Sequence, residues 1–222
     1  MLRRLYTALI LILLPMFCRA EQDLIAIRLW CELEPMVQEN EEYPLSTEAA
    51  QKRALEEARE ILSGMIYGFR FSYTPGDETR QINEEFTATP IAEILWGDPN
   101  MRITDAYVRD SFLFVKVYYD LEDFQFARRR AWASNSVDSS SGLGEYSVFI
   151  APSPEGKRQA LREALKNAVR NALRPVYFNK PREVTGEMLI WSEPHTIIQS
   201  GTYATQLDVK LRVKEIRSYS LF

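Results

Sequence analysis

The chain has a single histidine, His195, and this residue limits the chemistry that the sequence can support. A Ser–His–Asp triad would have to use it, and no second histidine exists to build a histidine-rich metal cluster. Pro194 precedes it and indicates a bend within a hairpin. We therefore predict that His195 is a structural residue at or near the surface, not a catalytic base or a metal ligand.

The carboxylates are numerous, but their spacing is typical of a solvated surface. Residues 52–60 mix glutamates with lysine and arginine at helical spacing, which favours surface ion pairs. Residues 39–42 form an acidic loop without the Asp-x-Asp spacing of a calcium site. Gly142 and Gly144 lack the third glycine and the following helix of a dinucleotide-binding loop. We assign no catalytic, metal-binding or cofactor-binding residue.

Aromatic and arginine side chains gather where the first half of the chain ends. They form a candidate patch for binding a partner protein or a membrane surface, because large exposed apolar areas usually mark interaction sites. The alternative is a second core layer beside a solvated run of charge. Trp30 and Phe114 raise the same question, because they lie opposite the apolar faces of their expected strands. The residues of the candidate patch are Phe124, Phe126, Arg128, Arg129, Arg130 and Trp132.

Residues 1–20 have the plan of a secretion signal, with an arginine pair, an apolar run at 9–14, and small residues before a cleavage site after Ala20. The apolar run is too short to span a bilayer, which takes about 20 residues. We expect cleavage near Ala20 and a periplasmic location for residues 21–222. Lipidation at Cys18 is the alternative, although the residues before it are not small.

Loss of the signal would remove three arginines and change the formal net charge from −4 to −7. An acidic protein is poorly suited to nonspecific nucleic-acid binding, which depends on Lys and Arg at the phosphates. No later segment is apolar enough to span a membrane. The cysteine that remains, Cys31, lies in an alternating apolar run, so we expect a buried free thiol. Intermolecular pairing is the alternative and would require exposure.

Hydrophobic periodicity predicts a first α+β unit over residues 21–127. Residues 23–33 alternate as a half-buried strand, residues 47–67 carry the apolar stripe of a helix, and residues 102–122 form a hairpin. Residues 70–100 are interpreted as a long connection rich in turn signals.

A second α+β unit is predicted for residues 145–222. It begins with a short strand at 146–150, continues with a helix that starts at Pro154, and ends in a hairpin joined at residues 200–201. Residues 128–144 are rich in arginine, serine and glycine, and we predict that they form a flexible linker between the units.

Both units have the order strand–helix–strand–strand. Residues 54–58 resemble residues 160–164, and residues 114–117 resemble residues 208–211, so we interpret the chain as an internal duplication. The predicted fold class is α+β, with two tandem units that are each an antiparallel sheet with one helix packed across a face.

An Ala-rich amphipathic helix at residues 49–62 and a long alternating strand at residues 203–213 follow the export signal. This combination resembles the bacterial envelope proteins related to flagellar assembly protein T and its small outer-membrane lipoprotein relatives. The SIMPL-domain periplasmic proteins are a second resemblance. The first resemblance implies strand–helix–strand–strand domains and a structural or assembly role, and it supplies no catalytic residue to transfer.

These features predict a non-catalytic exported envelope protein that acts as a structural, assembly or interaction factor, with a flagellar association implied by the resemblance. The expected partners are envelope or flagellar proteins, a second copy of the chain, or the outer-membrane surface contacted peripherally. We expect no cofactor and no nucleic acid. The alternative is a periplasmic small-ligand carrier, or a hydrolase with carboxylates in the groove between the units.

Overall fold

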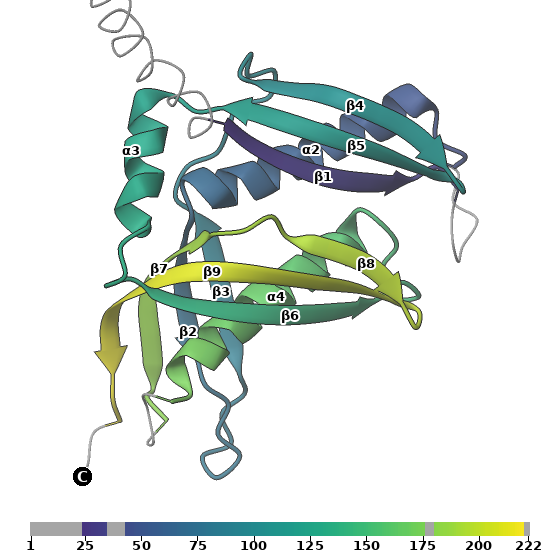
Figure 1. The fold of residues 1–222 in the computed structure, drawn as a ribbon. Coiled ribbons are helices and arrows are strands. Elements are labelled where there is room, and N and C mark those ends of the chain that lie inside the picture. The colour runs from purple at the N-terminus through teal and green to yellow at the C-terminus, as the bar shows by residue number, and fades with distance from the viewer. Residues whose placement is uncertain (1–23, 35–42, 176–179, 220–222) are drawn as a thin grey trace, which may run out of the picture.

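The computed structural model describes residues 24–34, 43–175 and 180–219. Within these ranges it contains three helices and nine strands in two antiparallel sheets, which confirms the α+β class (Figure 1). The predicted signal at residues 1–20 and the acidic loop at 39–42 lie outside the described residues. No helix in the described ranges is long and apolar enough to cross a membrane.

The first unit contains β1 (Leu24–Glu32), α2 (Thr47–Ile66), β4 (Met101–Arg109) and β5 (Phe112–Asp120). Its sheet has the order β1-β5-β4, and α2 lies across one face of it (Figure 1). The helix begins where predicted, because the Ser46 side chain accepts a hydrogen bond from the Ala49 backbone N–H and so satisfies an end group of the helix. The β4–β5 turn places Asp110 and Ser111 at positive φ, the geometry of a tight hairpin.

The second unit contains β6 (Asp138–Ser147), α4 (Glu155–Leu173), β7 (Glu183–Ile190), β8 (His195–Gln199) and β9 (Thr202–Arg217). β9 pairs with β6 along one side and with β7 and β8 in succession along the other. The first strand of each unit therefore pairs with the last strand, and the last strand pairs with the middle one. This shared topology supports the duplication hypothesis.

The connection over residues 70–100 contains a hairpin that the sequence reasoning missed. It is formed by β2 (Phe69–Thr74) and β3 (Glu85–Pro90), and β2 pairs with β7. Strands from the first half of the chain therefore extend the sheet of the second unit, in the order β3-β2-β7-β9-β6. Alternation of aromatic and polar residues over β2 was the signal that could have revealed it.

The predicted flexible linker at residues 128–144 is corrected by the structure. α3 (Asp123–Trp132) occupies its start, and β6 pairs with β9 over ten consecutive positions. The strand expected at residues 146–150 is thus the end of β6 and the turn after it. Glycines stand in β6 because α4 lies directly on the strand: a Cβ on Gly142 would lie 2.0 Å from a backbone oxygen of α4.

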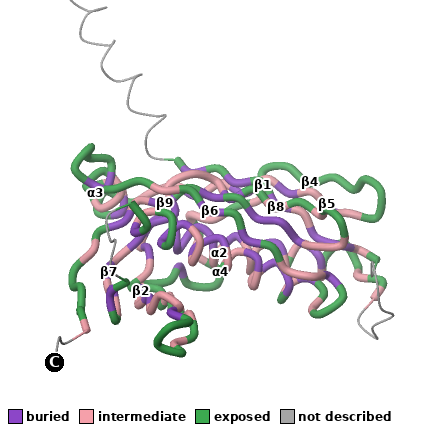
Figure 2. The backbone as a smooth tube through the Cα atoms, turned by 90° about the horizontal axis from the view of Figure 1, so that it is seen from below, coloured by how far each residue is buried: buried purple, intermediate pink, exposed green. Residues whose placement is uncertain are grey.

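One continuous core joins the two units. Buried side chains from α2, β1 and β5 belong to the same apolar cluster as those from α4, β2, β7 and β9. Figure 2 shows these buried positions running through the middle of the molecule, between the outer layers. The two units are therefore halves of one packed body, and the residues where they meet are the first place to look for a site.

Candidate functional site

The candidate patch predicted from the sequence lies on α3, but its side chains do not share one surface. Phe124 is 56% exposed and Arg130 is also exposed, whereas Phe126 is half-buried. Trp132 is only 2% exposed and belongs to a small apolar cluster with Val137 and Leu189. The patch is therefore divided between solvent and the interior.

The inward-facing arginines of α3 tie it to the rest of the fold. Arg128 donates a hydrogen bond to the backbone oxygen of Tyr67 at 2.8 Å. Arg129 donates to the backbone oxygens of Met65 at 2.7 Å and Trp191 at 2.8 Å, and burial lowers the pKa of its guanidinium. These bonds join the end of α2 to the end of β7, so α3 acts mainly as a brace between the units.

A row of aromatic rings crosses the face of the first sheet that is turned away from α2. In the strand register Trp30, Phe114 and Tyr107 lie side by side on β1, β5 and β4. Tyr107 and Phe114 stack with ring centroids 5.3 Å apart, and the Arg109 guanidinium lies 5.0 Å from the Phe114 centroid. Tyr107 is 50% exposed, whereas Trp30 is half-buried. The row therefore runs from solvent at β4 to the junction of the two units at β1.

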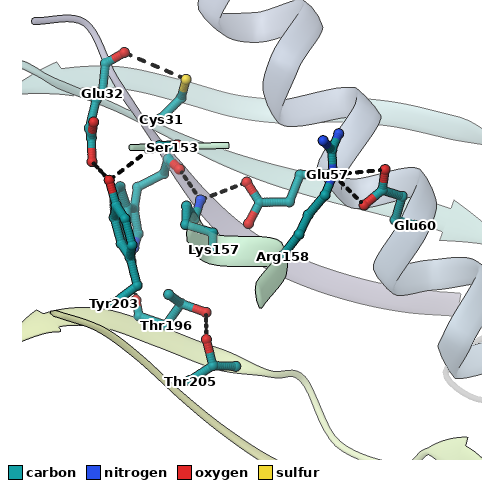
Figure 3. A network of polar contacts seen from close by, with 11 residues as sticks. Cys31, Glu32, Glu57, Glu60, Ser153, Lys157, Arg158, Thr196, Tyr203 and Thr205 are labelled. Carbon is teal, nitrogen blue, oxygen red and sulfur yellow. Dashed lines mark hydrogen bonds and ion pairs between the residues drawn. The ribbon is translucent and has the colours of Figure 1, made fainter. Parts of the chain in front are cut away.

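At that junction a carboxyl group is buried. Glu32, at the end of β1, is 1% exposed, and the Tyr203 hydroxyl from β9 donates a hydrogen bond to it at 2.8 Å (Figure 3). The Tyr203 oxygen in turn accepts from the Ser153 backbone N–H at 2.9 Å. Burial raises the pKa of Glu32, and burial together with the Glu32 charge raises the pKa of Tyr203.

Lys157 from the first turn of α4 links the same junction to α2. Its ammonium donates to the Trp30 backbone oxygen at 2.7 Å and to Glu57 at 2.6 Å, and it lies 4.2 Å from the centroid of the Trp30 ring (Figure 3). Arg158 repeats this link one residue later by binding Glu60 at 3.0 Å. Each buried ion in the junction therefore has a partner from another element, as buried charges require.

Cys31 lies on the other face of β1, within the core. Its thiol is buried, as the sequence predicted, and burial raises its pKa to about 11. The sulfur lies 3.6 Å from the Glu32 backbone oxygen. Because the reactive form of cysteine is the thiolate, this environment makes Cys31 unreactive near neutral pH.

A cavity of about 480 Å³ lies between α2 and α4, and a second one of about 310 Å³ lies between β1 and β8. The second cavity is bounded by Trp30 and by His195, which is exposed at the start of β8 just after the bend at Pro194, as expected. Glu57 and Glu193 also line it, and each contacts a cation. Within the described residues, no group of three or more His, Cys, Asp or Glu side chains could hold a metal ion.

Sequence reasoning did not identify Glu32, Lys157 and Tyr203 as a cluster. They come from β1, α4 and β9, and only the fold brings them together. The one local signal was the position of Lys157 on the apolar side of its helix, where a lysine requires a partner.

A protein-family model matches residues 16–219 of the chain. An uncharacterized protein of Treponema pallidum (strain Nichols) is similar to it, with 25% identity over 201 residues that cover 89% of this chain and 83% of that protein. No solved structure matches this chain significantly. Because the family match spans both units, it includes both sheets and the junction between the units.

Proposed function

We propose that the chain, which belongs to the family whose model matches residues 16–219, is a non-catalytic exported envelope protein that binds another protein. The observation that carries the proposal is the aromatic row, which leaves Tyr107 half-exposed at the outer strand of the first sheet, where it stacks on Phe114. Exposed aromatic rings next to an arginine are typical of protein interfaces. The Lys157–Glu57 ion pair and the Tyr203–Glu32 hydrogen bond serve a different purpose, because each of them joins the two units.

The cellular setting of the proposal comes from the sequence. The signal predicted at residues 1–20 implies export to the periplasm, and the resemblance to flagellar assembly protein T points to a flagellar or outer-membrane assembly partner. Two other partners are proposed for the chain: a second copy of itself and the outer-membrane surface, which it would contact peripherally.

In-cell photo-crosslinking tests it. A photo-reactive amino acid replaces Tyr107 in one strain and the exposed Lys52 of α2, on another face, in a matched control. We expect a specific adduct with an envelope protein from position 107 only, which mass spectrometry would identify. Absence of an adduct at 107, or equal adducts at both positions, would contradict the assignment of this surface. Fractionation and N-terminal sequencing of the mature chain test export and cleavage after Ala20.

The cavity between β1 and β8 favours a small-ligand carrier as a second candidate. Its wall combines the Trp30 ring with the exposed His195, a combination that suits a small ligand with an apolar part and a polar end. The hydrolase alternative draws less support, because Glu57 and Glu193 are each engaged by a cation. A screen of small carboxylates and phosphates, read by Trp fluorescence and thermal shift, separates the carrier from the binding protein.

A further inference from the structure

Outer strands of a sheet expose backbone N–H and C=O groups that can pair with another chain, and proteins usually protect them. β1 is protected by the second unit, because Glu193 accepts from the Arg28 backbone N–H and Lys157 donates to the Trp30 backbone oxygen. The outer side of β8 meets the same region, where the Trp30 indole donates to the Thr196 backbone oxygen at 2.8 Å.

The edge of β6 is protected by side-chain hydrogen bonds, and the edge of β4 is protected by an irregular register and by charged residues. On β6 the backbone oxygens of Leu143 and Ser141 accept from Asn167 and Asn171 of α4, at 2.7 Å and 3.0 Å. β4 carries a register shift near Ile103 and several charged side chains, both of which disfavour pairing with a further strand.

β3 differs from all of these. It pairs with β2 over its whole length, and no described residue pairs with its other side. Between Glu85 and Pro90 its residues are Phe, Thr, Ala and Thr, which carry no charge, and phenylalanine and threonine are enriched in strands. The outer side of β3 is therefore an open edge over residues 86–89, which ends at Pro90 because proline has no backbone N–H to donate.

The larger cavity borders this edge. It is the groove of about 480 Å³ between α2 and α4, and it is bounded by Ala88 and Pro90 of β3 and by the apolar side chains of Phe69, Leu161 and Leu165. A strand added to β3 would direct alternate side chains toward this groove, because side chains of a strand alternate between the two faces of a sheet.

The charges of the groove indicate what such a strand would carry. Arg158 engages Glu60 and also Glu155, at 3.0 Å and 3.6 Å. Arg59 and Arg162 line the groove and have no ion pair or side-chain hydrogen bond within the described residues. Of the acids that line it, only Glu93 is likewise unengaged, so cations are in excess among the unpaired groups.

We propose that β3 and the groove together bind an extended segment of a partner protein, which joins the sheet as an additional strand. Its backbone pairs with residues 85–89, an apolar side chain enters the groove against Phe69 and Leu165, and a carboxylate two residues along the segment, on the same face, reaches Arg59 and Arg162. Main-chain hydrogen bonds supply affinity in this mode, and the side-chain positions supply specificity. The proposal rests on the proposed function only in taking a protein as the partner.

Selection of peptides against the mature chain tests this inference. A displayed library of random decapeptides is the probe, and the binders are synthesised and measured by fluorescence anisotropy. We expect sequences that alternate apolar residues and include an acid. Exchange of the exposed Arg162 for glutamate (R162E) should weaken binding about tenfold through loss of a charge-assisted bond, whereas the matched reversal Lys52→Glu should leave it unchanged.

Backbone pairing has its own signature. N-methylation at alternate positions of a selected peptide should weaken binding about tenfold only where the amide faces β3, and amide NMR shifts should map to β3 and to the groove side of α4. Binders that map elsewhere, or that tolerate every N-methylation, would overturn the proposal. Self-association of the chain through β3, detected by sedimentation, would replace the partner segment with a second copy and would also overturn it. If selection fails while position 107 still crosslinks to an envelope protein, only this inference falls and the proposed function stands.

Discussion

Replacement of Lys157 by methionine is the most informative single perturbation of the junction. The Lys157 side chain is 4% exposed and its ammonium bridges Glu57 and the Trp30 backbone oxygen, so its removal leaves an anion and a carbonyl without their partner. Methionine has a similar length and keeps the apolar contacts of the side chain. The change therefore isolates the charge and its hydrogen bonds.

The expected cost follows from the burial of the pair. Removal of one member of a buried ion pair costs about 3–5 kcal/mol, and because Glu57 keeps 17% exposure we expect about 3 kcal/mol for Lys157→Met. A second substitution, Glu57→Leu, removes the unpaired charge. The double variant should then lose only about 1 kcal/mol, mainly for the unpaired Trp30 oxygen. A native stability of about 5–15 kcal/mol leaves both variants folded.

Urea unfolding of the mature chain, followed by tryptophan fluorescence and far-UV circular dichroism, measures these free energies. Lys52→Met on the exposed side of α2 is the control, and its effect should stay within about 0.5 kcal/mol. A loss below about 1 kcal/mol for Lys157→Met would refute the view that this ion pair holds the units together. So would a double variant whose loss equals the sum of the single losses, because independent sites add.

Three further predictions concern stability and its pH dependence. Burial raises the pKa of Glu32 above its ordinary value of 4.5, so the fold favours the protonated form relative to the unfolded chain, and native stability falls as the pH rises from 4.5 through the raised pKa. Glu32→Gln does not titrate, so in urea titrations it should gain stability relative to the native chain as the pH rises above 4.5, and a pH-independent difference would argue against this. A Cβ at position 144 would lie 2.1 Å from the Ala160 backbone oxygen, so Gly144→Ala should lower the unfolding free energy by about 3 kcal/mol, and a neutral effect would show that α4 can lift off β6. Trp132→Ala should cost about 3–5 kcal/mol in thermal and urea melts, whereas Phe124→Ala should change stability by less than about 0.5 kcal/mol; equal effects would mean that α3 does not divide the patch as described.

The elements with a strong hydrophobic period were predictable from the sequence. The helix at residues 47–67 and the hairpin at 102–122 agree with α2 and β4–β5 to within two residues, and the long last strand appears as β9. In each case one face of the element is buried in the core, so apolar residues recur along the sequence with the period of that element.

β3 and β6 could not be recognised in this way, for two physical reasons. In β3 the half-buried Phe86 and Ala88 alternate with exposed threonines, but the strand has six residues and none of them is fully buried, so the period is too short to distinguish it from a loop. β6 contains serines and glycines that are typical of a loop, and it needs the glycines because α4 approaches its backbone too closely for a larger residue. The need for glycine in β6 is imposed by its contact with α4, so it cannot be recognised from the residues of β6 alone.

The candidate patch on α3 shows the same division. Its residue types indicated a binding surface, but the side that α3 turns toward α2 and β7 decides that Arg129 and Trp132 are internal. A helix of this kind exposes or buries a residue according to where its neighbours lie, and those neighbours are about 60 residues away in the chain.

By itself, the sequence determined the α+β class, the repeated strand–helix–hairpin order and the buried thiol of Cys31, because each follows from the local spacing of apolar residues. Only the tertiary structure decided that β2 and β3 join the sheet of the second unit, and that Glu32, Tyr203 and Lys157 meet at one junction. A buried charge is stable only beside its partner, and strand pairing is a contact between distant segments. Both are properties of positions in space, which the residue order specifies only through the complete fold.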